Sequence, residues 1–209
     1  MDKEIIRESR VLIVDDNPAN AALMEKILRQ AGYLHFMSIN DSREVVNQLR
    51  TFRPDLIVLD LMMPHVDGFG VMTQLRGYIP DETYLPILVI TADVSKPARE
   101  RALAVGAKDF LTKPVDTTEA ALRIYNLLET RWLYRQIQDK NRVLMQQVRS
   151  GIERLAAANA ELDRLADAAV PAALLVAVRK CVAKAVESID QIGKTASGSD
   201  RSAELATAD

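Results

Sequence analysis

Cysteine and histidine are scarce in this chain of 209 residues: the only cysteine is Cys181, and the only histidines are His35 and His65. One cysteine cannot form an internal disulfide, and it fits a reducing compartment. Two histidines leave most zinc sites and histidine-based catalytic schemes without enough ligands or bases. No apolar run reaches membrane-spanning length, and the N-terminus lacks the pattern of a signal peptide. We therefore expect a cytoplasmic protein without a membrane segment.

An excess of one charge sign is also missing. The 27 basic and 29 acidic residues give a formal net charge of -2. This balance argues against a chain whose main task is to coat nucleic acid or an anionic membrane. The length suffices for one domain of ordinary size and a smaller second part.

What the chain does have is an apolar run, residues 56–59, that follows Pro54 and Asp55 and ends on Asp60. Four consecutive apolar residues indicate a strand buried on both faces, which is typical of parallel sheets. Ligands of open α/β sheets bind outside the carboxyl ends of the strands, where Asp60 would lie. Taken alone, Asp60 could equally be a turn-capping residue.

Predicted strands and helices alternate five times up to about residue 125, which indicates right-handed crossovers between parallel strands. The sequence thus predicts an α/β fold with a doubly wound, five-stranded parallel sheet. The expected strands are residues 11–14, 33–39, 56–59, 86–90 and 110–112, and the helices between them are residues 21–31, 41–49, 68–76 and 97–105.

Four of these strands end in a polar residue that can do chemistry: Asp15 and Asp16, Asp60, Thr91, and Lys113. Because strand ends gather at one edge of a sheet, we expect these side chains to converge. Three adjacent carboxylates repel one another. A hard cation such as Mg2+, which binds oxygen ligands, would relieve the repulsion. If Asp60 attacks a phosphoryl group, then Mg2+, Thr91 and Lys113 can each hold one of its oxygens. The product would be an aspartyl phosphate.

These motifs, with Pro114 after Lys113, resemble the receiver domain of bacterial two-component response regulators over about residues 9–125. The resemblance implies a flavodoxin-like sheet with strand order 2-1-3-4-5. It also implies that Asp60 is the phosphoacceptor and that Thr91 and Lys113 contact the phosphoryl group. A sensor histidine kinase or a phosphotransfer protein would supply that group.

The same resemblance implies the metal ligands. Asp16, Asp60 and the backbone carbonyl of Met62 would bind Mg2+ directly. Asp15 would contribute largely through a bridging water. Phe110 falls where the family usually has an aromatic switch that turns inward when Thr91 moves toward the phosphate. A plain core role for Phe110 is the alternative.

From Thr117 onward the pattern predicts one long helix, residues 126–169, that continues the last receiver helix. Apolar positions recur at spacings of three and four, as in a heptad repeat, with Asn141 at an a position and Gly151 at a d position. We expect a homodimer through residues 127–169, and the alternative is a helix that folds back on its own receiver. The repeat positions, called the seam below, are Leu127, Thr130, Tyr134, Ile137, Asn141, Leu144, Val148, Gly151, Leu155, Ala158, Leu162, Leu165 and Ala169.

A second amphipathic helix is predicted over residues 170–192, with Pro171 at its start. Apolar residues beside the seam, such as Met145 and Ile152, also fit a four-helix bundle made of two hairpins. Residues 193–209 are rich in small and polar residues, so we expect disorder there.

The chain beyond residue 125 limits the output. No histidine lies beyond residue 65, which excludes a histidine phosphotransfer domain. Twelve basic and eleven acidic residues from Asn126 onward show no basic face for DNA, so nucleic-acid binding is the least favoured output. There is no room for a catalytic output domain, so we expect no enzyme beyond the autophosphatase activity of receivers. The leading hypothesis is a dimeric response regulator that signals through protein interaction; a constitutive helical scaffold whose receiver is a phosphate sink is the alternative.

Overall fold

A computed structural model describes residues 2–80, 83–93, 95–166, 176–185 and 187–188. The chain divides into two compact units, Met1–Ile137 and Gln138–Asp209.

The first unit is built on a five-stranded parallel sheet with the order β2-β1-β3-β4-β5, which confirms the predicted fold class and strand order. Every residue of β3 and β4 is buried, as expected for central strands covered on both faces. The strands are β1 (Arg10–Val14), β2 (His35–Ile39), β3 (Leu56–Asp60), β4 (Ile87–Thr91) and β5 (Asp109–Thr112).

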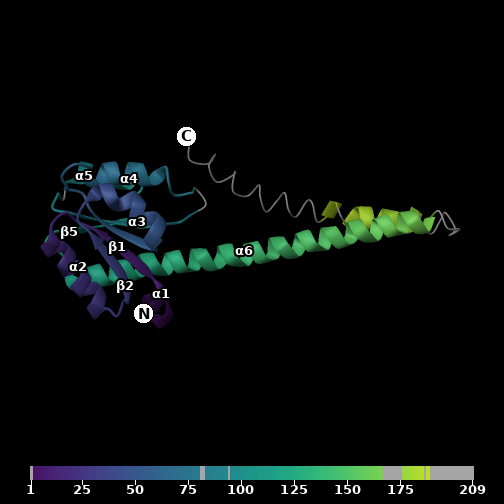
Figure 1. Cartoon of the computed structure of the whole chain (residues 1–209), viewed down its shortest axis with the longest axis horizontal. Coiled ribbons are helices and arrows are strands. Elements are labelled where there is room, and N and C mark those ends of the chain that lie inside the picture. The colour runs from purple at the N-terminus through teal and green to yellow at the C-terminus, as the bar shows by residue number, and fades with distance from the viewer. Residues whose placement is uncertain (1, 81–82, 94, 167–175, 186, 189–209) are drawn as a thin grey trace. The chain divides into compact units, whose positions relative to one another are not determined.

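Helices cover both faces of this sheet (Figure 1). One face packs against α1 (Lys3–Glu8), α2 (Pro18–Gln30) and the first turns of α6 (Thr117–Ala166). The other face packs against α3 (Val45–Phe52), α4 (Gly68–Arg76) and α5 (Lys96–Val105), and the short helix η1 (Ser42–Glu44) precedes α3.

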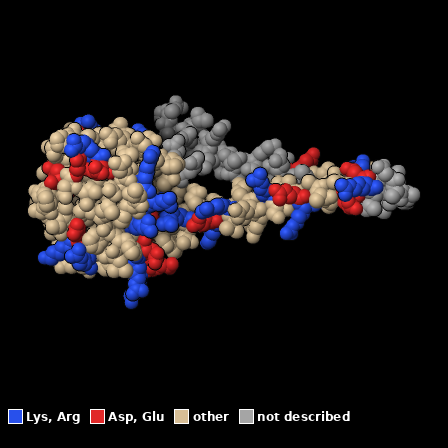
Figure 2. Space-filling model, in the orientation of Figure 1, with Lys and Arg blue, Asp and Glu red and all other residues tan. Residues whose placement is uncertain are grey.

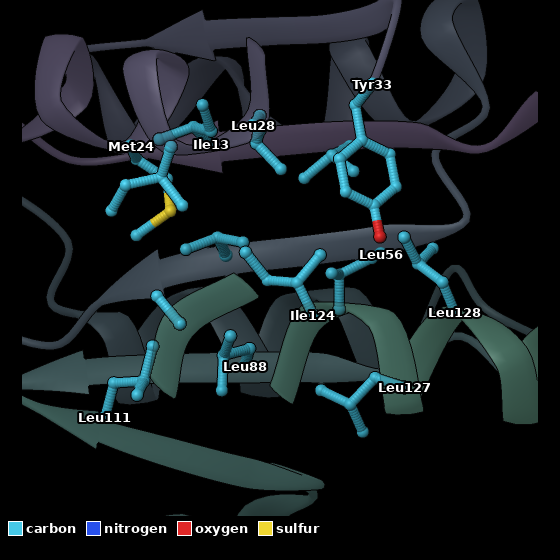
Figure 3. Packing of buried hydrophobic residues seen from close by; sticks show 14 of the residues in the cluster. Ile13, Met24, Leu28, Tyr33, Leu56, Leu88, Leu111, Ile124, Leu127 and Leu128 are labelled. Carbon is cyan, nitrogen blue, oxygen red and sulfur yellow. The ribbon is translucent and has the colours of Figure 1, made fainter. Parts of the chain in front are cut away.

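The core under α2 and α6 fixes where the last helix begins (Figure 3). Leu28 of α2, Leu56 of β3 and Ile124 of α6 are fully buried in the same hydrophobic cluster. Tyr33 lies among them, and its buried hydroxyl has no hydrogen-bond partner in the described part of the chain. Burial of this apolar surface stabilises the docking of α6 on the sheet.

The start of the chain differs from the prediction. Residues 3–8, for which no element is predicted, form α1, in which Ile5 is buried and the Asp2 carboxylate caps the Glu4 N–H. Helix α2 begins at Pro18 because Asn17 caps it, three residues before the predicted start. In α2, Leu23 is 39% exposed, and the neighbouring Met24 is the residue buried in the core.

The second unit contains the distal part of α6, which runs without a break through Gly151. Residues 176–185 and 187–188 are also helical, and Arg179 forms an ion pair with Asp163 of α6. Acidic and basic side chains are interspersed along the visible face of α6 (Figure 2). The predictions for residues 167–175 and 189–209 lie outside the described residues. Among those described, no helix has the length and apolar character needed to cross a membrane.

Candidate functional site

The carboxyl ends of β1, β3, β4 and β5 bring the predicted residues to one edge of the sheet. The Lys113 ammonium, directly after β5, lies 2.8 Å from Asp60 Oδ2 and 3.3 Å from Asp15 Oδ2. Thus one cation from the last strand contacts carboxylates that the first and third strands deliver. The predicted convergence of Asp15, Asp60 and Lys113 is present.

Asp16 completes an acidic cluster. Carboxylate oxygens of Asp15, Asp16 and Asp60 all lie within 4.8 Å of one another. Asp15 and Asp60 are buried, whereas Asp16 is half-buried. These three carboxylates carry more negative charge than one lysine balances, so the donor set fits a divalent cation with oxygen ligands such as Mg2+.

Hydrogen bonds divide the roles of the two neighbouring aspartates. Asp15 Oδ1 accepts the Asn17 N–H at 2.9 Å and the Asn20 side-chain amide at 3.2 Å. Asp16 makes no hydrogen bond or ion pair within the described part of the chain. Its carboxylate is therefore the one most available to a metal. Sequence reasoning missed Asn20, although its place one turn into a helix capped by Asn17 could have indicated it.

Burial raises the pKa of the Asp60 carboxyl above its ordinary value, although Lys113 and the Met62 N–H oppose the shift. The surroundings of Asp60 are of low polarity on one side, where a cavity of about 210 Å³ is lined mainly by apolar side chains, among them Met24, Val58 and Ile90. For the Lys113 ammonium, burial alone would lower the pKa. The hydrogen bond and charge of Asp60, with help from Asp15, outweigh it, and the net shift of the Lys113 pKa is upward.

Thr91 ends β4 with its side chain buried. Its Oγ1 accepts the Asp93 N–H at 3.0 Å, and Asp93 Oδ1 in turn accepts the Ser95 N–H at 2.8 Å. Hydrogen bonding by Ser95, first from its side chain and then from its backbone N–H, lowers the pKa of the Asp93 carboxyl. Since the Thr91 hydroxyl keeps its own proton free to donate, it can bind an oxyanion near Asp60.

The segment after β3 shapes the mouth of the site. Asp60 Oδ1 accepts the Met62 N–H at 3.3 Å, while the Met62 side chain is 71% exposed. Gly68, the first residue of α4, packs so closely on the end of β3 that a Cβ there would lie 2.5 Å from the Asp60 carbonyl oxygen. Only glycine allows α4 to start at this distance.

Phe110 lies outside the charged cluster. It is half-buried in β5, packs against the core under α5, and pairs in register with Val89 of β4. The Arg99 guanidinium stacks over its ring, with 3.8 Å between Cζ and the ring centroid. No sequence pattern predicts this contact.

Comparison with known proteins gives the same fold. Residues 11–125 match the family described as "Response regulator receiver domain". The response regulator MprA of Mycobacterium tuberculosis (strain ATCC 25177 / H37Ra) is 40% identical over 119 residues, which cover 57% of this chain and 50% of MprA. The alkaline phosphatase synthesis transcriptional regulatory protein PhoP of Bacillus subtilis (strain 168) is 34% identical over 57% of this chain and 48% of PhoP.

Solved structures agree. The receiver domain of the Francisella response regulator 1452 superposes with a TM-score of 0.54 at 27% identity and covers 59% of this chain and 98% of that chain. The chemotaxis protein CheY4 of Vibrio cholerae gives a TM-score of 0.52 at 29% identity, covering 57% and 98%. The chain spans about half the length of the curated relatives it matches first. With a family match over more than half of its residues, the chain belongs to the response regulator receiver domain family.

Proposed function

We propose that this chain is a response regulator that accepts a phosphoryl group on Asp60 from a sensor histidine kinase or a phosphotransfer protein. The observation that carries the proposal is the contact of one ammonium, Lys113, with the buried carboxylates of Asp60 and Asp15, beside the more exposed Asp16. An ion pair made only for stability would not gather two further carboxylates around Asp60.

In the proposed reaction an oxygen of Asp60 attacks phosphorus. A P–O bond forms, and the P–N bond to the donor histidine breaks with its electron pair leaving on nitrogen. Lys113 and the Thr91 hydroxyl bind phosphoryl oxygens and stabilise the charge that develops there. Asp15, Asp16 and the Met62 carbonyl would hold Mg2+ with Asp60. When bound, the ion neutralises part of the negative charge of the carboxylates and the phosphoryl group.

Beryllofluoride, a phosphoryl mimic, tests this assignment. With Mg2+ it should bind the wild type and Asp139→Asn, an exposed surface control, but not Asp60→Asn. Isothermal titration calorimetry gives the affinity, and acetyl phosphate followed by mass spectrometry locates the covalent group. Equal binding by Asp60→Asn would show that Asp60 is not the acceptor.

For the output we propose protein interaction through the helical part, with a homodimer formed by residues 127–169. Leu127, the first seam position, is the exception, because it is buried in the core of its own receiver. Support comes from large apolar side chains that α6 exposes, among them Leu133, Ile137 and Leu144, which are 51–57% exposed. These residues recur on one face of the helix, so a second copy could cover them as in a coiled coil. No separate catalytic activity is proposed, and the cytoplasm is the expected compartment.

The dimer is tested by light scattering coupled to gel filtration. Leu144→Lys should shift the mass toward the monomer, whereas Gln146→Lys, elsewhere on the exposed helix, should leave it unchanged. The same measurement with beryllofluoride separates the two hypotheses. If neither assembly nor binding of any partner responds to the mimic, the receiver is a phosphate sink on a constitutive scaffold.

A further inference from the structure

Two guanidinium groups approach the ring of Phe110 from helices on opposite faces of the sheet. Arg99 of α5 lies 3.8 Å from the ring centroid and Arg123 of α6 lies 5.9 Å from it. Asp109, the residue before Phe110, holds Arg123 with two hydrogen bonds of 2.7 and 2.8 Å. A cation over an aromatic face attracts its electron-rich centre, and a guanidinium can also stack flat on it. The nearer contact, from Arg99, therefore dominates.

The register of β4 and β5 connects this ring to Thr91. Val89 pairs with Phe110 and Thr91 pairs with Thr112, so Phe110 and Thr91 are diagonal neighbours on one face of the sheet. Any displacement of the Thr91 side chain toward Asp60 changes the packing beside the ring.

The chain between Thr91 and Arg99 connects the same two places a second time. The Thr91 hydroxyl accepts the Asp93 N–H, and Asp93 accepts the Ser95 N–H. Ser95 caps α5 through the Ala98 N–H, and its carbonyl accepts the Arg99 N–H at 3.2 Å. Turning Thr91 toward a phosphoryl group thus loosens the turn from which the Arg99 helix starts.

We propose that Arg99 is a positioning residue that holds Phe110 in its resting place and so lowers the fraction of molecules ready to bind a phosphoryl group on Asp60. This inference rests on the proposed function of Asp60. A contact made only in the resting state lowers the fraction of molecules in the binding-competent state. The apparent affinity for a ligand of the competent state falls in proportion to that fraction. Arg99 is exposed in the first turn of α5, so alanine can replace it without leaving a hole.

The helix offers a matched control. Arg101, also in α5, stacks over Phe69 of α4 with 4.1 Å between Cζ and the ring centroid. Arg101→Ala removes the same kind of contact and the same charge, but it leaves Phe110 alone. Any difference between the two variants therefore belongs to Phe110.

The first measurement is the affinity for beryllofluoride with Mg2+ in the full chain. Arg99→Ala should tighten the apparent dissociation constant about three- to tenfold, as loss of one cation–π contact in the resting state allows. Arg99→Lys should fall between, and Arg101→Ala should match the wild type. In a Phe110→Leu background, Arg99→Ala should have no effect. General damage to the fold would weaken binding instead, so the sign separates the two explanations.

The second measurement uses fluorine NMR of the chain labelled with fluorophenylalanine, whose four phenylalanines give four signals. In unliganded Arg99→Ala, the Phe110 signal should move part of the way toward its beryllofluoride-bound position, whereas Arg101→Ala should move only the Phe69 signal. If Arg99→Ala matches Arg101→Ala in both measurements while the wild type binds and Asp60→Asn does not, the role of Arg99 is refuted and the function of Asp60 stands. If Asp60→Asn binds as the wild type does, the proposed function fails first.

Discussion

The two ends of strand β3 carry aspartates of similar burial and opposite electrostatic surroundings. Asp55, just before the strand, is 7% exposed, and Asp60, its last residue, is 3% exposed. Asp55 accepts the Arg10 N–H at 3.1 Å and an Arg135 hydrogen bond at 3.0 Å, with Arg131 Nε 3.6 Å away. At this end positive charge is in excess.

At the other end the excess is negative, because Asp60 shares one lysine with Asp15 and lies beside Asp16. A buried carboxylate surrounded by arginines needs no further ligand and ties α6 to the sheet. A buried carboxylate among other carboxylates needs a further cation to balance the negative charge. Charge balance, and not burial, therefore distinguishes Asp55 from the proposed phosphoacceptor Asp60.

Removing Asp55 should have the largest effect on folding. Asp55→Ala leaves the Arg131 side chain, which is only 15% exposed, without its carboxylate. Loss of one partner of a buried pair should lower the free energy of unfolding by about 3 kcal/mol. Urea denaturation measures it. Asp60→Asn without Mg2+ should show no such loss. Equal losses at the two ends would show that charge balance does not distinguish the two aspartates.

Adding Mg2+ should affect only the Asp60 end. At ten times the dissociation constant, a bound ion should stabilise the fold by about 1.4 kcal/mol and raise the melting temperature by about 3 to 5 °C. Calorimetry with and without Mg2+ tests this. Asp16→Asn should abolish the increase, and Asp139→Asn should retain it. An increase that survives Asp16→Asn would mean that the ion binds elsewhere.

Lowering the pH without metal should remove the energetic cost of the buried Asp60 charge. Because burial raises the folded pKa of Asp60, both folded and unfolded states are ionised above that pKa and the fold bears the full cost of the buried charge. Below the ordinary carboxyl pKa both states are protonated and the cost disappears. The wild type should therefore gain stability relative to Asp60→Asn as the pH falls from about 7 to about 4. A widening deficit would contradict the raised pKa.

The smallest effect is expected from Arg135→Ala. The Arg135 side chain is 57% exposed, so its pair with Asp55 is screened by water. The free energy of unfolding should fall by less than about 1 kcal/mol. A loss as large as that of Asp55→Ala would place the anchor of α6 on the exposed arginine instead of Arg131.

The sequence was sufficient for the Asp60 end because its residues follow apolar runs, and parallel strands must bring their carboxyl ends together. It was insufficient for the Asp55 end. Arg135 is 80 residues away in the chain, and nothing in a helical repeat indicates that one of its arginines reaches back to the sheet. Helix α1 was missed for a similar reason, since six residues with Ile5 and Ile6 have too little periodicity to predict a helix.

The exposure of Leu23 shows a comparable limit of sequence patterns. Its spacing from Ile27 suits a helical face, but the side chain lies at the rim of the cavity near Asp60, and Met24 fills the core instead. Periodicity identifies a face to within one residue and does not select which neighbour turns inward. The stacking of Arg99 on Phe110 likewise depends on tertiary contacts between α5 and β5.

The close approach of Gly68 to the end of β3 has a consequence for mutational tolerance. In a saturation mutagenesis experiment scored by phosphoryl acceptance, Gly68 should tolerate as few substitutions as Asp60, although it has no side chain to contribute. An alanine Cβ would lie 2.5 Å from the Asp60 carbonyl oxygen, so every larger residue must displace the strand end that carries the proposed acceptor. A search for related sites that scores only charged residues would overlook this position.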